Sequence, residues 1–360
     1  MTDTKFSYAT PVFTVNGKPA DSLARDCVRL EIEEGLEGLK TLRVSLAGVG
    51  AGATGPPSPM FYLDGKVVDF GSKLRVAIGP DSAQRIVFDG VISAIEAVFV
   101  DAQPPLVVVS AEDALMRLRM TRRVKTYRDV TDAEIAAEIF SAHGLRSEVD
   151  ADGPRYDLVQ QVNQSDLAFL RERARLIRAE LWCSEDTLHF ATRTKRRGTK
   201  LTLVQGNHLL NVRLCADLAH QRSDVVVTGY DARTAKGIDE RSGDAISAEV
   251  TAGQTGVAIL RKTFGQAVSL RVREPALTAD EARSFAKAEM LRRARSFVRV
   301  SGTTRGSPDM IVGSNLDLQQ VGPPFDGPGY YAAVVRHTFD LTDGLRTHFV
   351  AERPTLNEAG

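Results

Sequence analysis

Residues 335–352 read VRHTFDLTDGLRTHFVAE, the most regular strand pattern in the chain. Apolar and polar residues alternate on both sides of Thr342-Asp343-Gly344, which is typical of two half-buried strands joined by a short turn. With Gly344 in the left-handed position of a three-residue loop, Leu341 pairs with Leu345. One face of this hairpin then holds Val335, His337, Phe339, Phe349 and Ala351. The other face holds Arg336, Thr338, Asp340, Arg346 and Glu352. A shift by one residue would mix the two faces, so the pattern specifies the register.

Short strand patterns also fill the first 110 residues. They are Val28–Glu33, Leu42–Leu46, Leu74–Ile78, Ile86–Phe88, Val91–Ile95 and Leu106–Val109. Turn signals at Asn16-Gly17, Asp64-Gly65 and Asp89-Gly90 separate many of them. Many short strands at close spacing favour a small antiparallel barrel or sandwich.

The middle of the chain predicts two helices and a strand pair. Thr131-Asp132-Ala133-Glu134 is a capping box that opens the first helix, and Gly144 ends it. Ser165 is the N-cap of the second helix, with Asp166 at its positive end. The second helix has an apolar stripe of Leu167, Leu170, Ala174 and Ile177, and its arginines at 171, 173, 175 and 178 are expected to face elsewhere. The strands Glu180–Cys183 and Leu188–Ala191 follow around the turn Ser184–Asp186.

Strand patterns return from about residue 200, including Val225–Thr228. A further helix interrupts them, opened by the capping box Thr278–Glu281 and running to about Arg295. The length of 360 residues allows two or three folding units.

The charge balance weakens a role in nucleic-acid binding. The chain carries 46 basic and 46 acidic side chains, whereas a dedicated DNA-binding protein usually has a net basic face. Hydrophobic residues make up 43% and charged residues 26%, as in an ordinary globular protein. No run of about 18 apolar residues occurs, so no membrane span is expected. The polar segment Met1–Tyr8 lacks the order of a secretory signal, so synthesis in the cytoplasm is expected.

The cysteines and histidines give no pattern of a metal or disulfide site. Cys27, Cys183 and Cys215 are far apart and have apolar neighbours, which favours buried, reduced thiols. The six histidines show no HExxH spacing. His337 is expected to be a semi-buried strand histidine with a hydrogen-bond partner, and His348 to lie on the opposite face of the hairpin.

The run Gly50–Gly55 matches the dinucleotide-binding pattern GxGxxG, but Pro56-Pro57-Ser58-Pro59 follows where a helix would have to begin. A flexible loop is the preferred interpretation. The basic clusters Arg122–Lys125 and Lys195–Lys200 are interpreted as solvated loops or subunit contacts. The carboxylates Asp64, Asp89 and Asp343 suit turns. Two carboxylates could still converge in the fold as a catalytic acid and a nucleophile, but the sequence gives no sign of such a pair.

One run reads Val162-Asn163-Gln164-Ser165-Asp166-Leu167-Ala168-Phe169-Leu170 and continues through Arg173-Ala174 to Glu180-Leu181-Trp182. It is preceded by Phe88–Ser93, Ser110–Asp113 and His143-Gly144-Leu145. A second region holds Gly322–Tyr331, His337-Thr338-Phe339 and Gly344–Phe349. In order and spacing these stretches resemble the phage late control protein D family, the tail hub proteins related to the N-terminal hub part of VgrG. The resemblance covers most of residues 85–353, whereas the first 80 residues match only in strand pattern.

The resemblance implies a structural hub of a contractile tail baseplate, in a phage tail (virion) or a contractile injection system. Hubs of that family are homotrimers in which each subunit has two small antiparallel β-barrels of tail-tube type. Six barrels then form a ring that adapts the threefold spike to the sixfold inner tube. The partners implied are further copies of the chain, a spike protein, the inner tail tube protein and other baseplate components. A membrane span and a specific nucleic acid are not expected.

The expected fold class is therefore mainly β with α+β insertions. The domains are a first tube-like β-barrel at 1–118, an α+β domain at 119–198, a second tube-like β-barrel from 199–235 and 296–360, and an inserted strand-helix region at 236–295. Gln164, Ser165 and Asp166 match a helix start and are carried over as structural. Catalytic, cofactor-binding and metal-binding residues are all predicted to be none, with no cofactor and no enzyme activity. The chain ends at Gly360 without a β-helical spike, so the spike is expected to be a separate protein.

Two other functions stay open. A tail-associated cell-wall hydrolase would need two acidic groups about 5 to 10 Å apart in a cleft. A nucleic-acid-binding regulator would bind DNA in a salt-sensitive manner. The sequence does not distinguish a phage tail from an extracellular injection system, and it does not identify the residues of the subunit interfaces.

Overall fold

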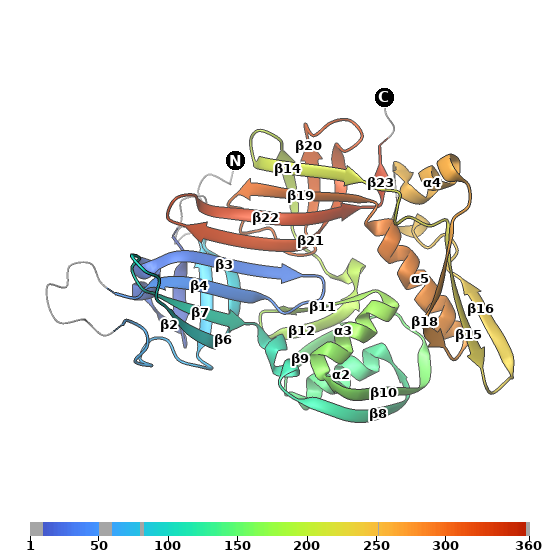
Figure 1. The fold of residues 1–360 in the computed structure, drawn as a ribbon, viewed down its shortest axis with the longest axis horizontal. Helices are drawn as coiled ribbons and strands as arrows, with labels where there is room; N and C mark the ends of the chain where they lie inside the picture. The colour runs from blue at the N-terminus through green and yellow to red at the C-terminus, as the bar shows by residue number, and fades with distance from the viewer. Residues whose placement is uncertain (1–9, 50–59, 80–82, 251, 358–360) are drawn as a thin grey trace.

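The computed structural model describes residues 10–49, 60–79, 83–250 and 252–357, and the protein is mainly β with α+β insertions (Figure 1). Within these residues, thirteen strands form one sheet in the order β14-β19-β22-β21-β3-β4-β7-β6-β5-β1-β2, with β13 and β20 attached beside β21. The fold class predicted from the sequence is confirmed, although the two strand-rich regions share this sheet. The GxGxxG run at 50–55 lies outside the described residues.

The N-terminal part of the sheet curls around its own core. Its elements are β1 (Val12–Val15), β2 (Lys18–Pro19), α1 (Asp21–Asp26), β3 (Cys27–Gly35), β4 (Thr41–Ala47), β5 (Lys73–Ile78), β6 (Arg85–Val98) and β7 (Leu106–Glu112). Alternate residues of β3 and β4 point inward, such as Leu30, Ile32 and Val44, and they are buried with Phe13 and Phe88. The period of two in the sequence therefore became an inner and an outer face.

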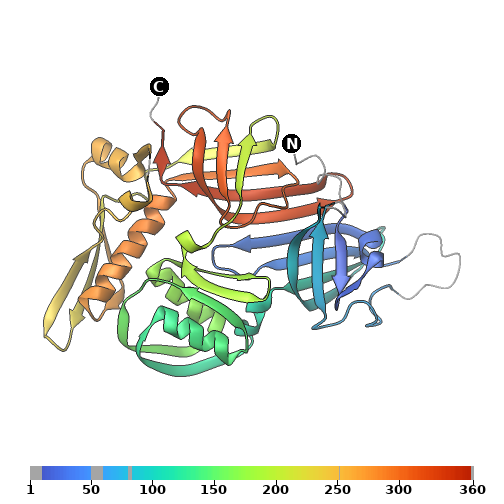
Figure 2. The ribbon, with the colours of Figure 1, turned by 180° about the vertical axis from the view of Figure 1, so that it is seen from behind.

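The C-terminal part forms a second curled segment around a separate core. It consists of β13 (Lys200–Val204), β14 (Leu209–Ala216), β19 (Val298–Arg305), β20 (Asn315–Gln319), β21 (Gly327–Asp340) and β22 (Gly344–Arg353). Leu316, Tyr330 and Phe349 are among its buried residues. Figure 2, the view from behind, shows the two curled segments side by side.

Strand β21 joins the two segments by pairing with β3, with Phe339 opposite Leu30 and Val335 opposite Glu34. The side chains of Phe339 and Leu345 belong to the N-terminal core rather than to the C-terminal one. The last hairpin thus completes a core built more than 200 residues earlier in the chain.

An α+β unit lies between the two segments in the sequence. It comprises η3 (Ala114–Arg119), β8 (Arg122–Thr131), α2 (Asp132–Ala142), β9 (Arg146–Asp150), β10 (Arg155–Ser165), α3 (Asp166–Ile177), β11 (Ala179–Ser184), β12 (Thr187–Thr192) and η4 (Arg193–Lys195). Strands β8 and β10 form a ribbon, and β11, β12 and β9 form a small sheet. The two helices lie between ribbon and sheet (Figures 1 and 2).

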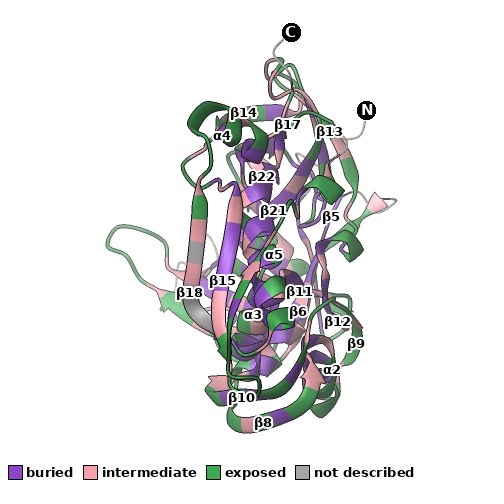
Figure 3. Ribbon diagram, turned by 90° about the vertical axis from the view of Figure 1, so that its right-hand side faces the viewer, coloured by how far each residue is buried: buried purple, intermediate pink, exposed green. Residues whose placement is uncertain are grey.

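The last unit contains the long helix α5. Its elements are β15 (Asp224–Asp231), β16 (Lys236–Arg241), η5 (Ser247–Glu249), β17 (Gln254–Thr255), α4 (Gly256–Phe264), β18 (Val268–Ala276) and α5 (Ala279–Arg295), and β17 pairs with β23 (Thr355–Leu356). Helix α5 packs against β15, β16 and α3. Figure 3 shows buried residues along β15, where Val225, Val226 and Val227 are all buried.

The predicted helix starts are confirmed. The Thr131 side chain accepts from Glu134 N, and the Glu134 side chain accepts from Thr131 N, a complete capping box. Ser165 caps α3 through Ala168 N, and Thr278 caps α5 through Glu281 N. The carboxylate of Glu281 differs from the expected box because it accepts from Leu277 N instead of Thr278 N.

Two strand predictions are corrected. Asp89-Gly90 was expected to be a turn, but β6 continues through it. The glycine is there because β7 passes very close: a Cβ on residue 90 would lie 2.3 Å from the carbonyl oxygen of Glu112. In the final hairpin, Phe339 pairs with Leu345 and Asp340 with Gly344, so the predicted register was off by two residues. A shift of two residues keeps each side chain on its face, so the predicted buried face is still correct.

The division into the predicted domains stays a prediction. Strand β15, which lies within the range 199–235 assigned to the second barrel, pairs with β16 and β18 in a separate three-stranded sheet. The prediction for the cysteines is wrong in part. Cys27 is buried, Cys183 is partly buried and Cys215 is exposed, and none of these three described residues forms a disulfide.

Candidate functional site

Three parts of the chain meet at a group of side chains, which we call the junction cluster and of which all but the partly buried Tyr331 are buried. Its members are Glu34 from β3, Glu180 from β11, Arg193 from η4, Arg196, Tyr331 from β21 and Glu352 from β22. No local sequence pattern predicts this cluster, because its members are scattered over more than 300 residues.

Arg193 binds two carboxylates at once. Its Nε donates to Glu180 Oε1 at 3.0 Å, and its Nη1 lies 2.5 Å from Glu352 Oε1. The Tyr331 ring lies 4.1 Å below the guanidinium carbon, and the Tyr331 hydroxyl donates to Glu180 Oε2 at 2.8 Å. Burial opposes the charge of Arg193, but Glu352 and Glu180 outweigh it and raise its pKa.

Arg196 connects the same carboxylate to the N-terminal part of the sheet. It donates to Glu34 and lies 3.4 Å from Glu180 Oε2, and its guanidinium stacks 4.9 Å from the ring of Trp182. Lys40 pairs with Glu34 at 3.0 Å. Glu180 therefore has contacts from β21 and from both arginines, so that it ties the α+β unit to both segments of the large sheet.

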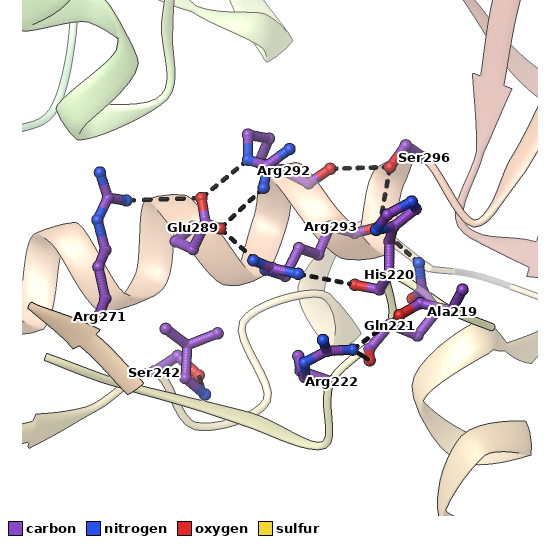
Figure 4. Close-up of polar contacts among 11 residues, drawn as sticks. Ala219, His220, Gln221, Arg222, Ser242, Arg271, Glu289, Arg292, Arg293 and Ser296 are labelled. Atoms are coloured by element: carbon purple, nitrogen blue, oxygen red, sulfur yellow. Dashed lines mark hydrogen bonds and ion pairs between the residues drawn. The ribbon is translucent and has the colours of Figure 1, made fainter. Parts of the chain in front are cut away.

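A second charged cluster lies on α5 around Glu289 (Figure 4). Glu289 Oε1 accepts from Arg293 Nε and Arg292 Nη2, both at 2.8 Å, and Glu289 Oε2 accepts from Arg292 Nε at 2.8 Å and Arg271 Nη1 at 3.5 Å. Burial would favour the neutral acid. The hydrogen bonds and charges of Arg292, Arg293 and Arg271 outweigh burial and lower the pKa of Glu289 to about 2.

The Glu289 cluster fixes the end of α5 to the segment that precedes β15. Arg293 donates to the carbonyl of His220 at 3.2 Å, and Gln221 donates to the carbonyl of Arg293 at 2.7 Å (Figure 4). A cavity of about 580 Å³ lies beside these contacts, lined by Cys215, Asp217, His220, Arg292, Arg293, Ser296, Phe297 and Arg299. In both clusters, charged side chains from different elements are locked together, which positions the units of the chain relative to one another.

The helix-start residues Ser165 and Asp166 lie where the sequence placed them. The Asp166 carboxylate is buried and, besides lying at the start of α3, it contacts three side chains: His143 Nε2 at 2.7 Å, Arg123 Nε at 3.0 Å and Gln161 Nε2 at 2.9 Å. Burial opposes its ionisation, but these contacts outweigh burial and lower the pKa of Asp166.

The histidine prediction for His337 is confirmed. The residue is 5% exposed, its Nε2 lies 3.1 Å from the carbonyl oxygen of Met310 and its Nδ1 lies 3.0 Å from Thr347 Oγ1. A carbonyl only accepts, so Nε2 carries the proton and the Thr347 hydroxyl donates to Nδ1. His348 lies on the opposite face and contacts Thr338 and Thr303.

Two predictions about basic residues are wrong in part, because Lys195, Arg197 and Lys200 are exposed as expected and so is Arg175 on α3. The cluster at 195–200 was interpreted as a solvated loop or subunit contact, but Arg196 is buried in the junction cluster. The arginines of α3 were expected to face away from the apolar stripe, but Arg173 is largely buried, with its Nε 2.5 Å from Asp132 Oδ1 and its guanidinium over Tyr156. In the cluster at 122–125, Arg123 pairs with Asp166 and Lys125 pairs with Glu138.

The three carboxylates expected at turns have different environments. Asp64 lies in a turn and accepts from Lys66 N, as expected, and Asp343 lies in the exposed hairpin loop. Asp89 lies within β6 and pairs with Arg75 at 2.6 Å. Among the described residues, no three His, Cys, Asp or Glu side chains gather where they could hold a metal ion. None of the described helices combines the length and apolarity that crossing a membrane requires.

The family model described as the Alg8 N-terminal domain matches residues 63–340. The chain belongs to this Alg8 N-terminal domain family. The matched range runs from the loop after β4 to the end of β21. It therefore includes every residue of the junction cluster except Glu34 and Glu352. No curated protein matches the sequence.

Solved structures with the same fold include tail proteins and a type VI secretion component. The 43 kDa tail protein of prophage MuSo2 from Shewanella oneidensis has a TM-score of 0.67 at 15% identity, over 96% of this chain and 98% of that one. A tail protein from Neisseria meningitidis MC58 has a TM-score of 0.65 at 13% identity, over 96% of both chains. An Escherichia coli component of the type VI secretion system, described as similar to the T4 tail proteins gp27 and gp5, has a TM-score of 0.60 at 14% identity, over 95% of this chain and 76% of that one.

These likenesses establish that this member of the Alg8 N-terminal domain family has a tail-protein fold over nearly its whole length. The family is named after Alg8, whereas solved structures with this fold are named as tail proteins. The fold is the more informative of the two here, because it extends over both curled segments, the α+β unit and α5.

Proposed function

We propose that this chain is a structural hub of a contractile tail baseplate, in a phage tail or a contractile injection system. In the proposed assembly, three copies form a ring that adapts a threefold spike to a sixfold inner tube. The chain is made in the cytoplasm and assembled with a spike protein, the tube protein and other baseplate components. The observation that carries the proposal is the tail-protein fold over 96% of the chain.

The arrangement of the sheet supports a ring-forming role. Each subunit of such a trimer would supply two curled β segments, and the chain has two, joined through β3 and β21. Since a ring needs its six segments at fixed angles, the buried ion pairs of the junction cluster would hold the two segments of each subunit in place.

Exposed apolar side chains supply surface for permanent contacts, because obligate interfaces are more apolar than ordinary surface. Val124 and Val162 lie directly opposite each other on the β8–β10 ribbon, and they are 82% and 61% exposed. Phe99 and Phe70, in the N-terminal part, are also well exposed. In this proposal the chain acts by assembly and has no catalytic site of its own.

Co-expression with candidate spike and tube proteins tests the proposal. Size-exclusion chromatography with light scattering should give three times the 39.1 kDa of one chain for the chain alone, or that mass plus the mass of the spike when the spike is bound. Electron microscopy of the complex should show a threefold ring whose six β segments face the tube. A chain that stays monomeric with the spike and the tube protein both present, and binds neither, would contradict the hub function.

A further inference from the structure

A cavity of about 540 Å³ lies between η4, the C-terminal sheet segment and the end of α5. Its lining is rich in charged side chains. The lining residues are Arg193, Thr194, Arg196, Arg197, Gly198, Lys200, Ala248, Glu249, Arg295, Asn315, Gly329, Tyr331, Glu352 and Pro354. Five of them are basic and two are acidic, and each of the two carboxylates is paired with an arginine of the same cavity. The cavity therefore carries a net positive charge.

Arg295 brings a guanidinium with an unused donor to this cavity. Its Nε and Nη2 donate to the two oxygens of Glu249 at 2.8 and 2.5 Å. Its Nη1 is buried and has no hydrogen-bond partner among the described residues, and the whole residue is 6% exposed. A buried charged donor that stays unsatisfied is costly, so it normally has an acceptor.

Arg193 contributes a second unused donor to the same cavity. Two of its nitrogens engage Glu180 and Glu352, as described above. The third, Nη2, is buried without a hydrogen-bond partner in the described part of the chain, and the residue is 8% exposed. Two arginines that are more than nine-tenths buried thus line one cavity, and each has a buried N–H group without a partner among the described residues.

Arg178, at the end of α3, adds to the excess of positive charge nearby. Burial lowers its pKa to about 10, and repulsion from Arg193 and Arg295 acts in the same direction. Arg197 and Lys200 lie exposed on the lining and form no ion pair among the described residues. An anion in this cavity would relieve the repulsion among these cations.

We propose that this cavity binds an oxyanion, a carboxylate or phosphate group, against the guanidinium side of its lining formed by Arg193 and Arg295. Guanidinium groups present planar pairs of donors that match such oxygens. The volume is within the range of small-molecule sites and exceeds what a single phosphate fills. The oxyanion therefore belongs either to a free organic acid or phosphate, or to an acidic side chain of a bound protein chain.

Isothermal titration calorimetry on the full chain, at constant ionic strength, tests the site. The probes are citrate, inorganic phosphate and a tetraglutamate peptide, with chloride as the reference ion. We expect at least one probe to bind with a Kd below about 10 mM and to raise the unfolding temperature. Binding of citrate or phosphate identifies a small-molecule source, whereas binding of the peptide alone identifies a protein source.

Three variants locate the binding. Arg295→Lys keeps a positive charge opposite Glu249 but removes Nη1, the nitrogen without a partner. Arg197→Ala removes an exposed cation of the lining without disturbing the core. Each should weaken binding, by about tenfold for Arg295→Lys. Arg29→Ala removes a positive charge that is also exposed but lies on β3, outside the lining, and should leave the affinity unchanged. Absence of binding by all three probes, or equal affinity in the wild type, Arg197→Ala and Arg295→Lys, would overturn the proposal.

Discussion

Glu180 is surrounded by donors from η4, from the residue that follows it and from β21, since Arg193, Arg196 and the hydroxyl of Tyr331 all contact its two oxygens. The residue is 4% exposed, so its charge is almost entirely removed from water. Such a carboxylate adds little net stability when it is fully paired, but leaving its cations unpaired is expensive. At this scale the junction depends on one side chain.

We expect Glu180→Gln to lower the free energy of unfolding by about 2 to 3 kcal/mol, because Arg193 and Arg196 lose their shared anion and keep only Glu352 and Glu34 as partners. Tyr331→Phe is the matched control. It removes only the hydroxyl contact with Glu180 and keeps the ring under Arg193, so its cost should be about 1 kcal/mol. Denaturant unfolding of both variants measures the difference, and equal costs would show that the carboxylate charge is not what holds the junction.

The buried His337 predicts a loss of stability in acid. Burial lowers its pKa from 6.5 to about 4, with Lys40 acting in the same direction. Between these values the unfolded chain binds more protons than the folded one, so stability falls as the pH drops from about 6.5 to about 4. The loss attributable to His337 is about 3 kcal/mol at about 1.4 kcal/mol per pKa unit.

His337→Gln isolates this contribution, because glutamine does not titrate. The stability difference between wild type and variant should shrink by about 3 kcal/mol from pH 7 to pH 4, as followed by urea unfolding. Asp113 changes the absolute curves in the opposite sense, since burial raises its pKa to about 7, but it is present in both proteins and cancels in the difference. Parallel pH profiles for the two proteins would refute the assignment.

Strand β6 runs for 14 residues, although its sequence contains the turn dipeptide Asp89-Gly90. The glycine is needed for close approach, because β7 passes over it at the carbonyl of Glu112. The aspartate serves the strand as well, through ion pairs with Arg75 and Lys73 from β5. At the scale of the element, pairing with β5 and β7 keeps Asp89-Gly90 in a strand, although the dipeptide by itself predicts a turn.

Gly90→Ala should destabilise the protein by about 1 to 3 kcal/mol, since its Cβ would force β6 and β7 apart. Gly237→Ala in β16 is the control. No atom lies within 4 Å of the Cβ that it would add, so its effect on stability should stay below about 0.5 kcal/mol. Thermal unfolding followed by circular dichroism compares the two, and a neutral Gly90→Ala would mean that the strands are further apart than described.

The whole molecule is held together by a strand pair distant in sequence. Residues 334–340 of β21 pair with residues 29–35 of β3, and Phe339 and Leu345 fill the N-terminal core. A fragment that ends at residue 198 would keep the N-terminal segment and the α+β unit but lack these two side chains and the neighbour of β3. Its core would be incomplete, and an unpaired strand edge would be exposed.

We therefore expect the fragment 1–198 to lose cooperative unfolding or to aggregate, and co-expression with residues 199–360 to restore a soluble complex. Trp182 is the single tryptophan of the chain, and it lies beside the junction, so its fluorescence reports the result. If the fragment stays monomeric and unfolds at the temperature of the full chain, the shared sheet is not needed for stability.

The sequence by itself determined the local features. The N-caps at Thr131, Ser165 and Thr278 were predicted correctly, because capping bonds join residues three positions apart. The inward face of the last hairpin was also correct, because alternation along a strand repeats every two residues.

Only the tertiary structure decided which strands pair and which charges are buried. Nothing in the residues around Leu30 indicates that Phe339 is its neighbour, and nothing around Arg196 distinguishes it from the exposed Arg197 beside it. The pairing of β3 with β21 and the junction cluster both join segments more than 150 residues apart. Burial depends on what packs over a side chain, which a pattern of neighbours in sequence does not contain.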